Sequence, residues 1–237
     1  MVWTLVRRGL VVGVLAGLLA GAFAFVFGEP RVQDAIDIEE AQASLVPVLG
    51  HIGDWVVSRP EQRGGLFLAT ALYGVAVGGL FAVAFAALRG RGAERSDWQL
   101  STRLAAALFA AVVLVPWIKY PPNPPAVGDP GTIGERTAYF VVLLAGSLLA
   151  LLAAARVVWS VRDGVQPWVR PLLGAGTFIA VAGGLALALP GVNEVPDGFP
   201  ASLIWEFRLS SLGTQAVLWA GLGIGFGIAT ERRVAAA

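Results

Sequence analysis

Several residue types that build common functional sites are scarce or missing from this chain. Its 237 residues include no cysteine, one histidine and one methionine, so disulfides, thiolate metal sites and cysteine nucleophiles are excluded. A metal site made of several histidines or thioethers from this chain alone is excluded for the same reason. Charged residues make up only 14% of the chain, whereas soluble domains carry about 25%. That deficit is too large for a protein whose whole surface faces water.

Catalytic signatures are missing as well. The sequence has no phosphate-binding GxxxxGK[ST] motif. Its one histidine lies outside the apolar runs, and no Ser-His-Asp or HExxH arrangement can be drawn with it. The net charge of +1 gives no reason to expect a nucleic-acid partner. We therefore expect a protein that is not an enzyme and holds no permanent cofactor; a small polar cavity lined by paired carboxylates would revive the enzyme alternative.

Apolar residues, in contrast, make up 57% of the chain and gather in six runs. A bilayer core about 30 Å thick needs roughly 20 such residues in a helix, and helix satisfies the backbone amides that hydrocarbon cannot. The sequence predicts an all-α polytopic membrane protein, one membrane domain over residues 1–237, with six transmembrane helices as three hairpins. The helices are expected at residues 9–28, 64–88, 102–119, 137–158, 171–191 and 209–230.

The first run has an alternative interpretation. Arg7 and Arg8 followed by an apolar stretch could form a cleaved signal peptide. The stretch is, however, as long as a full span, and glycines recur in it every four residues, a pattern that lets another helix approach closely. The sixth run interleaves two pairs of glycines at the same spacing. The glycines are Gly9, Gly13, Gly17 and Gly21 in the first run, Gly74 and Gly78 in the second, and Gly221, Gly223, Gly225 and Gly227 in the sixth.

Charge is distributed unevenly between the two sides of the predicted membrane domain. One side collects eleven basic residues and four acids, and the other collects six basic residues and twelve acids. Because cytoplasmic loops are rich in Lys and Arg, we expect the basic side, which includes both termini, to face the cytoplasm. We expect the chain to lie in the lipid bilayer of a bacterial plasma (inner) membrane. The acidic loops, residues 29–63, 119–136 and 191–208, would then be extracytoplasmic.

The first of these loops is predicted to contain an amphipathic helix over residues 32–45, after Pro30 and before Pro47. Glu39 falls on its apolar stripe and Glu40 lies beside it. These acids either bind a ligand or reach the lipid headgroups from a helix lying in the interface. His51 follows in the same loop, either as a metal ligand or as a solvated side chain.

The second and third loops are rich in proline. Residues 119–137 read KYPPNPPAVGDPGTIGERT, which favours an extended, stiff backbone. The third loop resembles the second loosely, because each has an Asn among prolines and then an acid–base pair before the next helix. These pairs, Glu135 with Arg136 and Glu206 with Arg208, are expected to cross-link two related hairpins at the membrane surface.

The spans themselves carry no ionisable group deep in the membrane. This argues against a proton-driven transporter acting alone and against an intramembrane protease, because such proteins use intramembrane ionisable residues. The few polar side chains in the spans include Thr70, Tyr73, Ser147, Thr177, Ser210, Ser211, Thr214 and Gln215.

Four strings together resemble the CbtA family, predicted cobalt-transporter membrane subunits of bacteria. They are FGEP at residues 27–30, EEA at 39–41, the second loop as quoted, and NEVPDGFPASLIWEFRLSSLGTQAVLWAGLG from residue 193. The resemblance covers essentially the whole chain. It implies a cobalt-uptake subunit serving cobalamin synthesis, with the cobalt ion as substrate and a small, single-span, histidine-bearing CbtB-like subunit as partner.

The metal-ligand candidates are the oxygen-bearing side chains of the acidic loops. Cobalt(II) prefers oxygen and imidazole ligands, so this chain would supply oxygens and an attractive field for cations, while the partner supplies histidines. The candidates are Glu29, Glu39, Glu40, Asp129, Glu135, Asn193, Glu194, Asp197 and Glu206. The alternative function is a non-transporting scaffold whose glycine stripes pack partner helices and whose loops dock an extracytoplasmic protein. A homo-oligomer is possible under either hypothesis.

Overall fold

The computed structural model describes residues 2–44, 58–91, 96–162 and 164–231. Within these ranges the chain forms helices and no strand, and six helical segments are long and apolar enough to cross a membrane. The all-α class and the six spans are therefore confirmed. The spans are Val2–Ala41, Arg59–Leu88, Asp97–Lys119, Pro130–Ser160, Val169–Ala188 and Ala201–Thr230.

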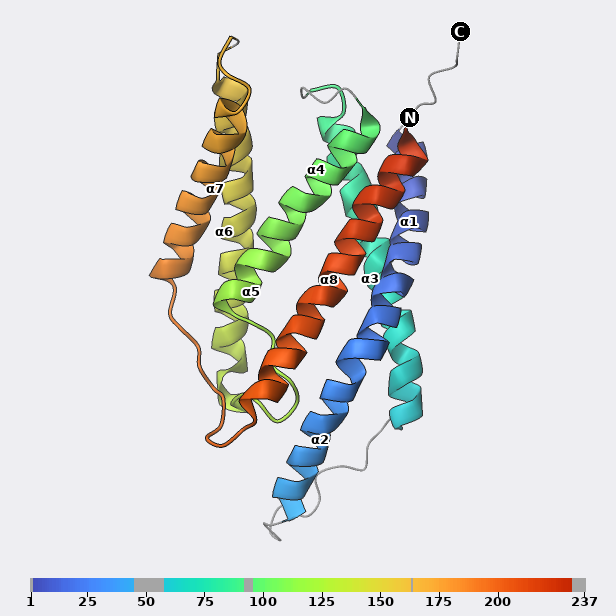
Figure 1. Cartoon of the computed structure of the whole chain (residues 1–237), viewed down its shortest axis with the longest axis vertical. Helices are drawn as coiled ribbons and strands as arrows, with labels where there is room; N and C mark the ends of the chain where they lie inside the picture. The colour runs from blue at the N-terminus through green and yellow to red at the C-terminus, as the bar shows by residue number, and fades with distance from the viewer. Residues whose placement is uncertain (1, 45–57, 92–95, 163, 232–237) are drawn as a thin grey trace. The chain divides into compact units, whose positions relative to one another are not determined.

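Figure 1 shows the order of the elements along the chain. The helix predicted in the first acidic loop is present, but it continues directly from the first span. The last helix begins earlier than expected, so Glu206 and Arg208 lie on a helix and not in a loop. The elements are α1 (Val2–Phe23), η1 (Ala24–Gly28), α2 (Glu29–Ser44), α3 (Arg59–Leu88), α4 (Asp97–Phe109), η3 (Ala110–Leu114), α5 (Val115–Lys119), η4 (Pro130–Thr132), α6 (Ile133–Ser160), α7 (Val169–Ala188) and α8 (Ala201–Thr230).

The chain divides into two compact units. The first unit holds α1, α2, α3, most of α4 and α8, and the second holds α5, α6 and α7. The last two spans, which the sequence groups as one hairpin, therefore belong to different units. The single membrane domain over residues 1–237 stays a prediction. The units are Met1–Ala106 with Asn123–Ala126 and Pro200–Ala237, and Ala107–Pro122 with Val127–Phe199.

Glycines set the contact between α1 and α3 in the first unit. A methyl group added at Gly9, Gly13 or Gly17 would overlap a backbone carbonyl oxygen of α3. The two backbones can lie this close only because no side chain stands between them. The facing residues are Gly78, Gly74 and Thr70, respectively. The four-residue stripe of α1 thus packs against a helix of the same chain.

The four glycines of α8 lie alternately against two neighbouring helices, α1 and α4. A methyl group at Gly221 or Gly225 would contact side chains of α1, whereas one at Gly223 or Gly227 would contact α4. The Ser101 hydroxyl of α4 also donates a hydrogen bond of 2.7 Å to the Gly223 carbonyl. The interleaved spacing therefore lets α8 pack closely on two sides. Between these helices, Phe81 and Phe85 of α3 meet Phe226 of α8 edge to face, with ring centroids 5.4 and 5.0 Å apart.

A π-helical turn precedes a proline in two of the spans. The last bond of η1 runs from the Glu29 amide to the Ala24 carbonyl, and Pro30 follows. In the third span the corresponding bond joins the Val115 amide to the Ala110 carbonyl, and Pro116 follows. Proline cannot donate an amide hydrogen and its ring crowds the carbonyl four residues earlier. The wider π turn accommodates that loss without ending the helix.

In the second unit α6 packs along α7. The end of α7 is fastened to the end of α5 by two side chains. Lys119 Nζ donates to the Leu189 carbonyl at 2.8 Å, and the Tyr120 hydroxyl donates to the Pro190 carbonyl at 2.8 Å. A cation at a helix C-terminus complements the free carbonyls there. These bonds hold the start of the second acidic loop beside the end of α7.

Candidate functional site

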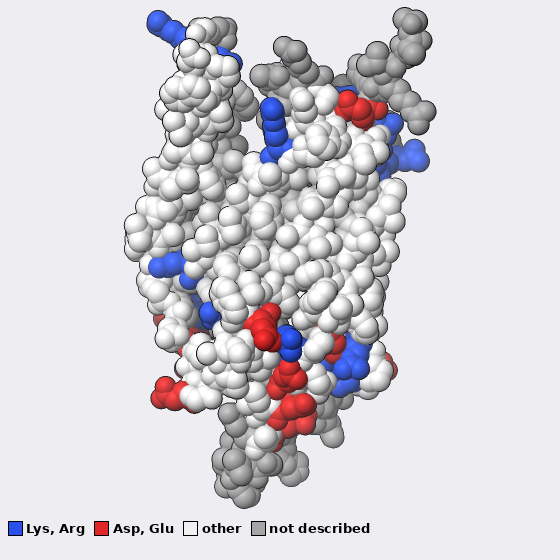
Figure 2. All heavy atoms as spheres, viewed as in Figure 1, with Lys and Arg blue, Asp and Glu red and all other residues white. Residues whose placement is uncertain are grey.

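Acidic side chains gather along α2 in the first unit, where they form a red patch in Figure 2. The sequence of this helix carries Glu29 at its start and four further acids along its length. Uncharged side chains, drawn white, cover the middle of the unit's spans in the same view. The polar ends of the helices are therefore the places where a charged substrate could first be bound.

Glu29 stands at the start of α2 between two arginines of α3. Its Oε1 atom accepts hydrogen bonds from Arg59 Nη2 at 2.6 Å and from Arg63 Nε at 2.8 Å. The Glu29 side chain is only 14% exposed. Arg59 also contacts the side-chain oxygens of Gln33 and Gln62. Because two positive charges face one negative charge here, a metal ion would have to displace both arginines to bind Glu29.

Glu206 and Arg208, near the start of α8, each contact a residue of another segment. Glu206 accepts from Arg31 Nε of α2 at 2.8 Å, and Arg208 Nη2 donates to Asn123 Oδ1 at 2.8 Å. The acid–base pair noted in the sequence therefore joins α8 to two other segments, through Arg31 and Asn123. Because side chains two apart on a helix do not face each other, each instead reaches a different segment and ties it to α8.

A second polar cluster forms in the second unit, where Glu194 of the third acidic loop meets the start of α6. Glu194 Oε2 accepts from the Asp129 amide at 2.9 Å and from Arg136 Nη1 at 3.1 Å. Its other oxygen accepts from the Thr132 hydroxyl. Asp129 itself caps the turn η4 by accepting from the Gly131 amide at 2.8 Å. The structure thus brings two of the candidate residues, Asp129 and Glu194, into one network.

This network depends on its charges and on one glycine. The hydrogen bond from Thr132, the bond from the Asp129 amide and the nearby charge of Arg136 lower the pKa of Glu194. Gly128 has a φ of +126°, and a methyl group there would lie 2.7 Å from Arg136 Nη1. Arg136, which the sequence noted beside Glu135, thus pairs with Glu194 of the third acidic loop.

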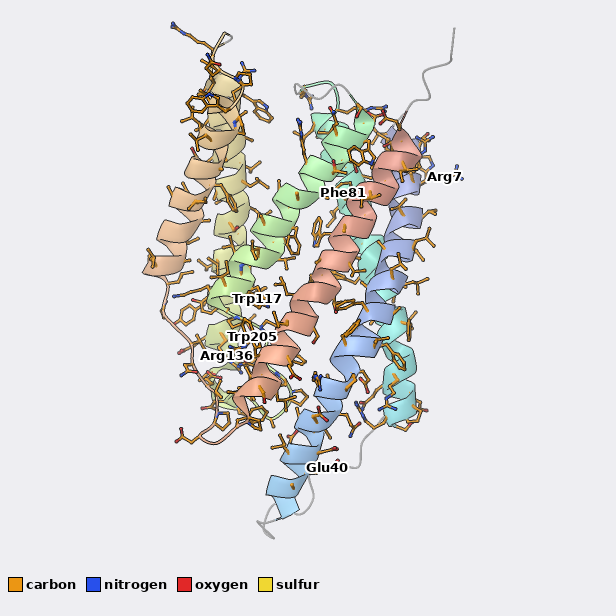
Figure 3. All side chains as sticks on the ribbon, viewed as in Figure 1. Arg7, Glu40, Phe81, Trp117, Arg136 and Trp205 are labelled. Carbon is orange, nitrogen blue, oxygen red and sulfur yellow. The ribbon has the colours of Figure 1, made fainter. Side chains whose placement is uncertain are left out.

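The remaining candidates are exposed. Glu39 and Glu40 lie on the second half of α2, and Figure 3 labels Glu40 there. Ala35 and Ile36 of the same helix are buried, so Glu39 lies outside the buried part of the predicted apolar stripe. Glu135, Asn193 and Asp197 are also exposed. His51 lies outside the described residues.

The described part of the chain, residues 2–44, 58–91, 96–162 and 164–231, contains no group of three His, Asp or Glu side chains placed to hold a metal ion. Three of the candidate carboxylates, those of Glu29, Glu194 and Glu206, are instead bound by arginines. A six-coordinate cation needs more oxygen or nitrogen ligands than any one of these positions provides.

Arg31, Arg59 and Arg63 were not singled out from the sequence, and Arg136 was noted only together with Glu135. Six basic residues stand among the twelve acids of the acidic loops, and each is a candidate ion-pair partner for one of those acids. Arg31, Arg59, Arg63 and Arg136 all lie within seven residues of a helix start. That position, at the membrane boundary, is the signal that could have identified them as ion-pair partners.

Deep in the first unit, most polar side chains are satisfied within their own helix. The hydroxyls of Thr70, Ser210 and Thr214 donate to carbonyls three or four residues earlier. Gln215 Oε1 and Trp219 Nε1 of α8 are buried and have no hydrogen-bond partner among the described residues. Trp219 was not among the polar residues noted from the sequence, although its indole N–H is a donor.

A comparison with known families gives a match over nearly the whole chain. The family profile described as "Probable cobalt transporter subunit (CbtA)" matches residues 2–231. No curated protein and no solved structure matches the chain. The matched range includes all six spans and both polar clusters described above. The chain therefore belongs to the CbtA family of probable cobalt transporter subunits.

Proposed function

We propose that this chain is the membrane subunit of a cobalt-uptake system that supports cobalamin synthesis. The observation that carries the proposal is the family match over residues 2–231. The six apolar spans provide the membrane part that such a subunit needs. Cobalt is the substrate in this proposal and not a resident cofactor.

Metal would be gathered at the acidic ends of the helices, on the extracytoplasmic side, with both termini in the cytoplasm. The distribution of basic residues supports that orientation. Of the candidate ligands, Glu39 and Glu40 are the best placed to attract a cation first, because they are exposed on an acidic helix. Glu135, Asn193 and Asp197 are exposed likewise. Glu29, Asp129, Glu194 and Glu206 would bind metal only after releasing their present partners.

A partner subunit that carries histidines would complete the coordination. The described chain offers carboxylate and amide oxygens without imidazole, and oxygen-only sites favour Mg²⁺, Ca²⁺ or Mn²⁺ over cobalt. The small, single-span, CbtB-like subunit is therefore proposed as the source of selectivity.

Cobalt accumulation in cells tests this function. Cells that lack the gene should take up less labelled cobalt than the parent at limiting concentration, and a plasmid carrying the gene with its partner should restore uptake. Equal accumulation in the two strains would rule the proposal out. Magnesium accumulation measured in parallel serves as the selectivity control, because a general loss of membrane integrity would change both metals.

The scaffold alternative is supported by one observation and weakened by another. Buried ionisable groups that would mark an ion path do not occur in the middle of the spans, which suits a protein that does not transport. The glycine stripes of α1 and α8, however, contact helices of this same chain. They are therefore already occupied and need no partner helix to explain them.

A further inference from the structure

The first span runs directly into α2 (Figure 1), but the two parts are held in different ways. In α1, an added methyl group at Gly13 or Gly17 would overlap a backbone oxygen of α3, so the two backbones are in direct contact. The sequence of α2 contains no glycine. Among the described side chains of this helix, residues 29–41, only Ala35 and Ile36 are buried. Backbone packing therefore fixes α1, whereas α2 has few packing contacts.

Ion pairs attach the start of α2 to two other helices of the first unit. Glu29 pairs with Arg59 and Arg63 of α3 at 2.6 and 2.8 Å, and Arg31 pairs with Glu206 of α8 at 2.8 Å. We call these three ion pairs the clamp. The side chains of Arg31, Glu206 and Arg63 are 38%, 47% and 43% exposed. Pairs this exposed are weak and are screened by salt, so the clamp can open without unfolding the unit.

The clamp holds the first turn of α2 from two sides. Positions 29 and 31 lie about 200° apart around a helix, which is why Glu29 reaches α3 and Arg31 reaches α8. Arg59 Nε also donates to Gln33 Oε1, one turn beyond Glu29, at 3.1 Å. These contacts together fix the direction in which α2 leaves the first span.

The helix is irregular at the point where its attachment changes. The Glu29 amide donates to the Ala24 carbonyl, five residues earlier, in the π turn η1. The next residue, Pro30, has no amide hydrogen to donate. The ladder of backbone hydrogen bonds is therefore interrupted between α1 and α2. Prolines and π turns are the usual sites of sharp helix bends, and π turns frequently occur at functional sites.

We propose that α2 is a movable element of the first unit, which turns about a hinge formed by η1 and Pro30 and whose direction the clamp sets. A bend of about 20° at the hinge displaces Glu40, about 17 Å further along the helix, by about 6 Å. The acids of α2 beyond the hinge move with it. Their use in gathering metal rests on the proposed function, whereas the hinge and the clamp do not.

Distances between spin labels test the clamp. The chain has no cysteine, so Glu40→Cys and Leu72→Cys place one label on α2 and one on α3 of the whole chain in lipid nanodiscs. Both positions are exposed, and neither belongs to the clamp. Double electron–electron resonance should give one population of distances for this labelled parent. Glu29→Gln/Glu206→Gln should add a second population, shifted by about 6 Å. An unchanged distribution in this charge variant would overturn the clamp.

A proline substitution tests the hinge. Pro30→Ala, added to the charge variant, should abolish the second population, because alanine supplies the missing amide hydrogen. Pro116→Ala removes the proline after the other π turn, η3, and is the matched control that should leave both populations. A second population that persists in the Pro30→Ala background would overturn the hinge.

Two further arms separate the clamp from general effects of charge and folding. Asp37→Asn/Glu39→Gln removes two charges from α2 outside the clamp and should keep the single population; a second population there would overturn the clamp. If the charge variant does not fold, the labelled parent at about 1 M salt replaces it, since charges are screened beyond about 3 Å there. An unchanged distribution at that salt concentration would likewise overturn the clamp. Because only distances are measured, this result and that of the cobalt-uptake experiment are independent.

Discussion

The carboxylate of Glu29 lies 2.6 Å from Nη2 of Arg59 and shares the same oxygen with Arg63. Through these contacts the start of α2 is fastened to the start of α3. Pro30 and Pro60 lie in the first turns of these two helices. Glu29, a candidate metal ligand in the sequence analysis, is thus an ion-pair partner that joins α2 to α3.

We predict that Glu29→Gln destabilises the first unit. The neutral amide cannot neutralise the two arginines, and hydrogen bonds between charged groups typically contribute about 1.5–3 kcal/mol. The midpoint of thermal unfolding of the purified protein should fall accordingly. Glu135→Gln, at an exposed position, is the control and should leave the midpoint unchanged. If Glu29→Gln leaves the midpoint unchanged and abolishes cobalt binding, Glu29 is a ligand after all.

Backbone contact between α1 and α3 leads to a second prediction. At Gly13 an added methyl group overlaps the Gly74 carbonyl, whereas at Gly176 of α7 nothing lies within 4 Å. Gly13→Ala should therefore destabilise the protein by about 1–3 kcal/mol through overpacking, although alanine favours helix over glycine. Gly176→Ala should be neutral or slightly stabilising. Thermal unfolding in the same detergent checks both, and equal midpoints for the two variants would contradict the packing described here.

The sequence alone predicted the parts of the fold that depend on local chemistry. Six apolar runs of bilayer length predict six spans because backbone amides must be satisfied in lipid, and the glycine spacing predicts close helix contacts. Periodicity does not show which helix meets which. The stripe beginning at Gly9 could have met any helix with small residues, and only the structure pairs it with Gly78 and Gly74.

The candidate site was less predictable for a physical reason. Acids were recognisable by type, but whether a carboxylate is free depends on which arginine reaches it from another segment. Arg136 pairs with Glu194 across a separation of 58 residues instead of with its neighbour Glu135. Which acid and which arginine form a pair depends on how the loops fold over the helix ends. The spacing of charged residues along the chain does not reveal these pairs.

Acid should weaken the network around Glu194. The folded state lowers the pKa of this carboxyl, first through the Thr132 hydrogen bond. A group whose pKa is lower when folded contributes stability that is fully present above its ordinary pKa of 4.5 and is lost as the pH falls through the folded value. Unfolding midpoints of the parent and of Glu194→Gln should thus differ at neutral pH and converge as the pH falls below 4.5 and through the lowered value. A constant difference across that range would contradict this assignment.

The last prediction concerns the exposed acids of α2. Glu39→Gln/Glu40→Gln removes two negative charges from the acidic patch without touching the arginine-bound carboxylates. If these acids concentrate the cation, the cobalt concentration that gives half-maximal uptake should rise by about tenfold, and the maximal rate should stay the same. The charge-preserving double variant Glu39→Asp/Glu40→Asp should retain most of the parent's uptake at low cobalt. Raising the ionic strength should also diminish the difference between parent and Gln variant, because salt screens exposed charges. Unchanged uptake by the Gln variant at every cobalt concentration would clear both residues of a role in metal capture and leave the arginine-bound acids as the remaining candidates in the described chain.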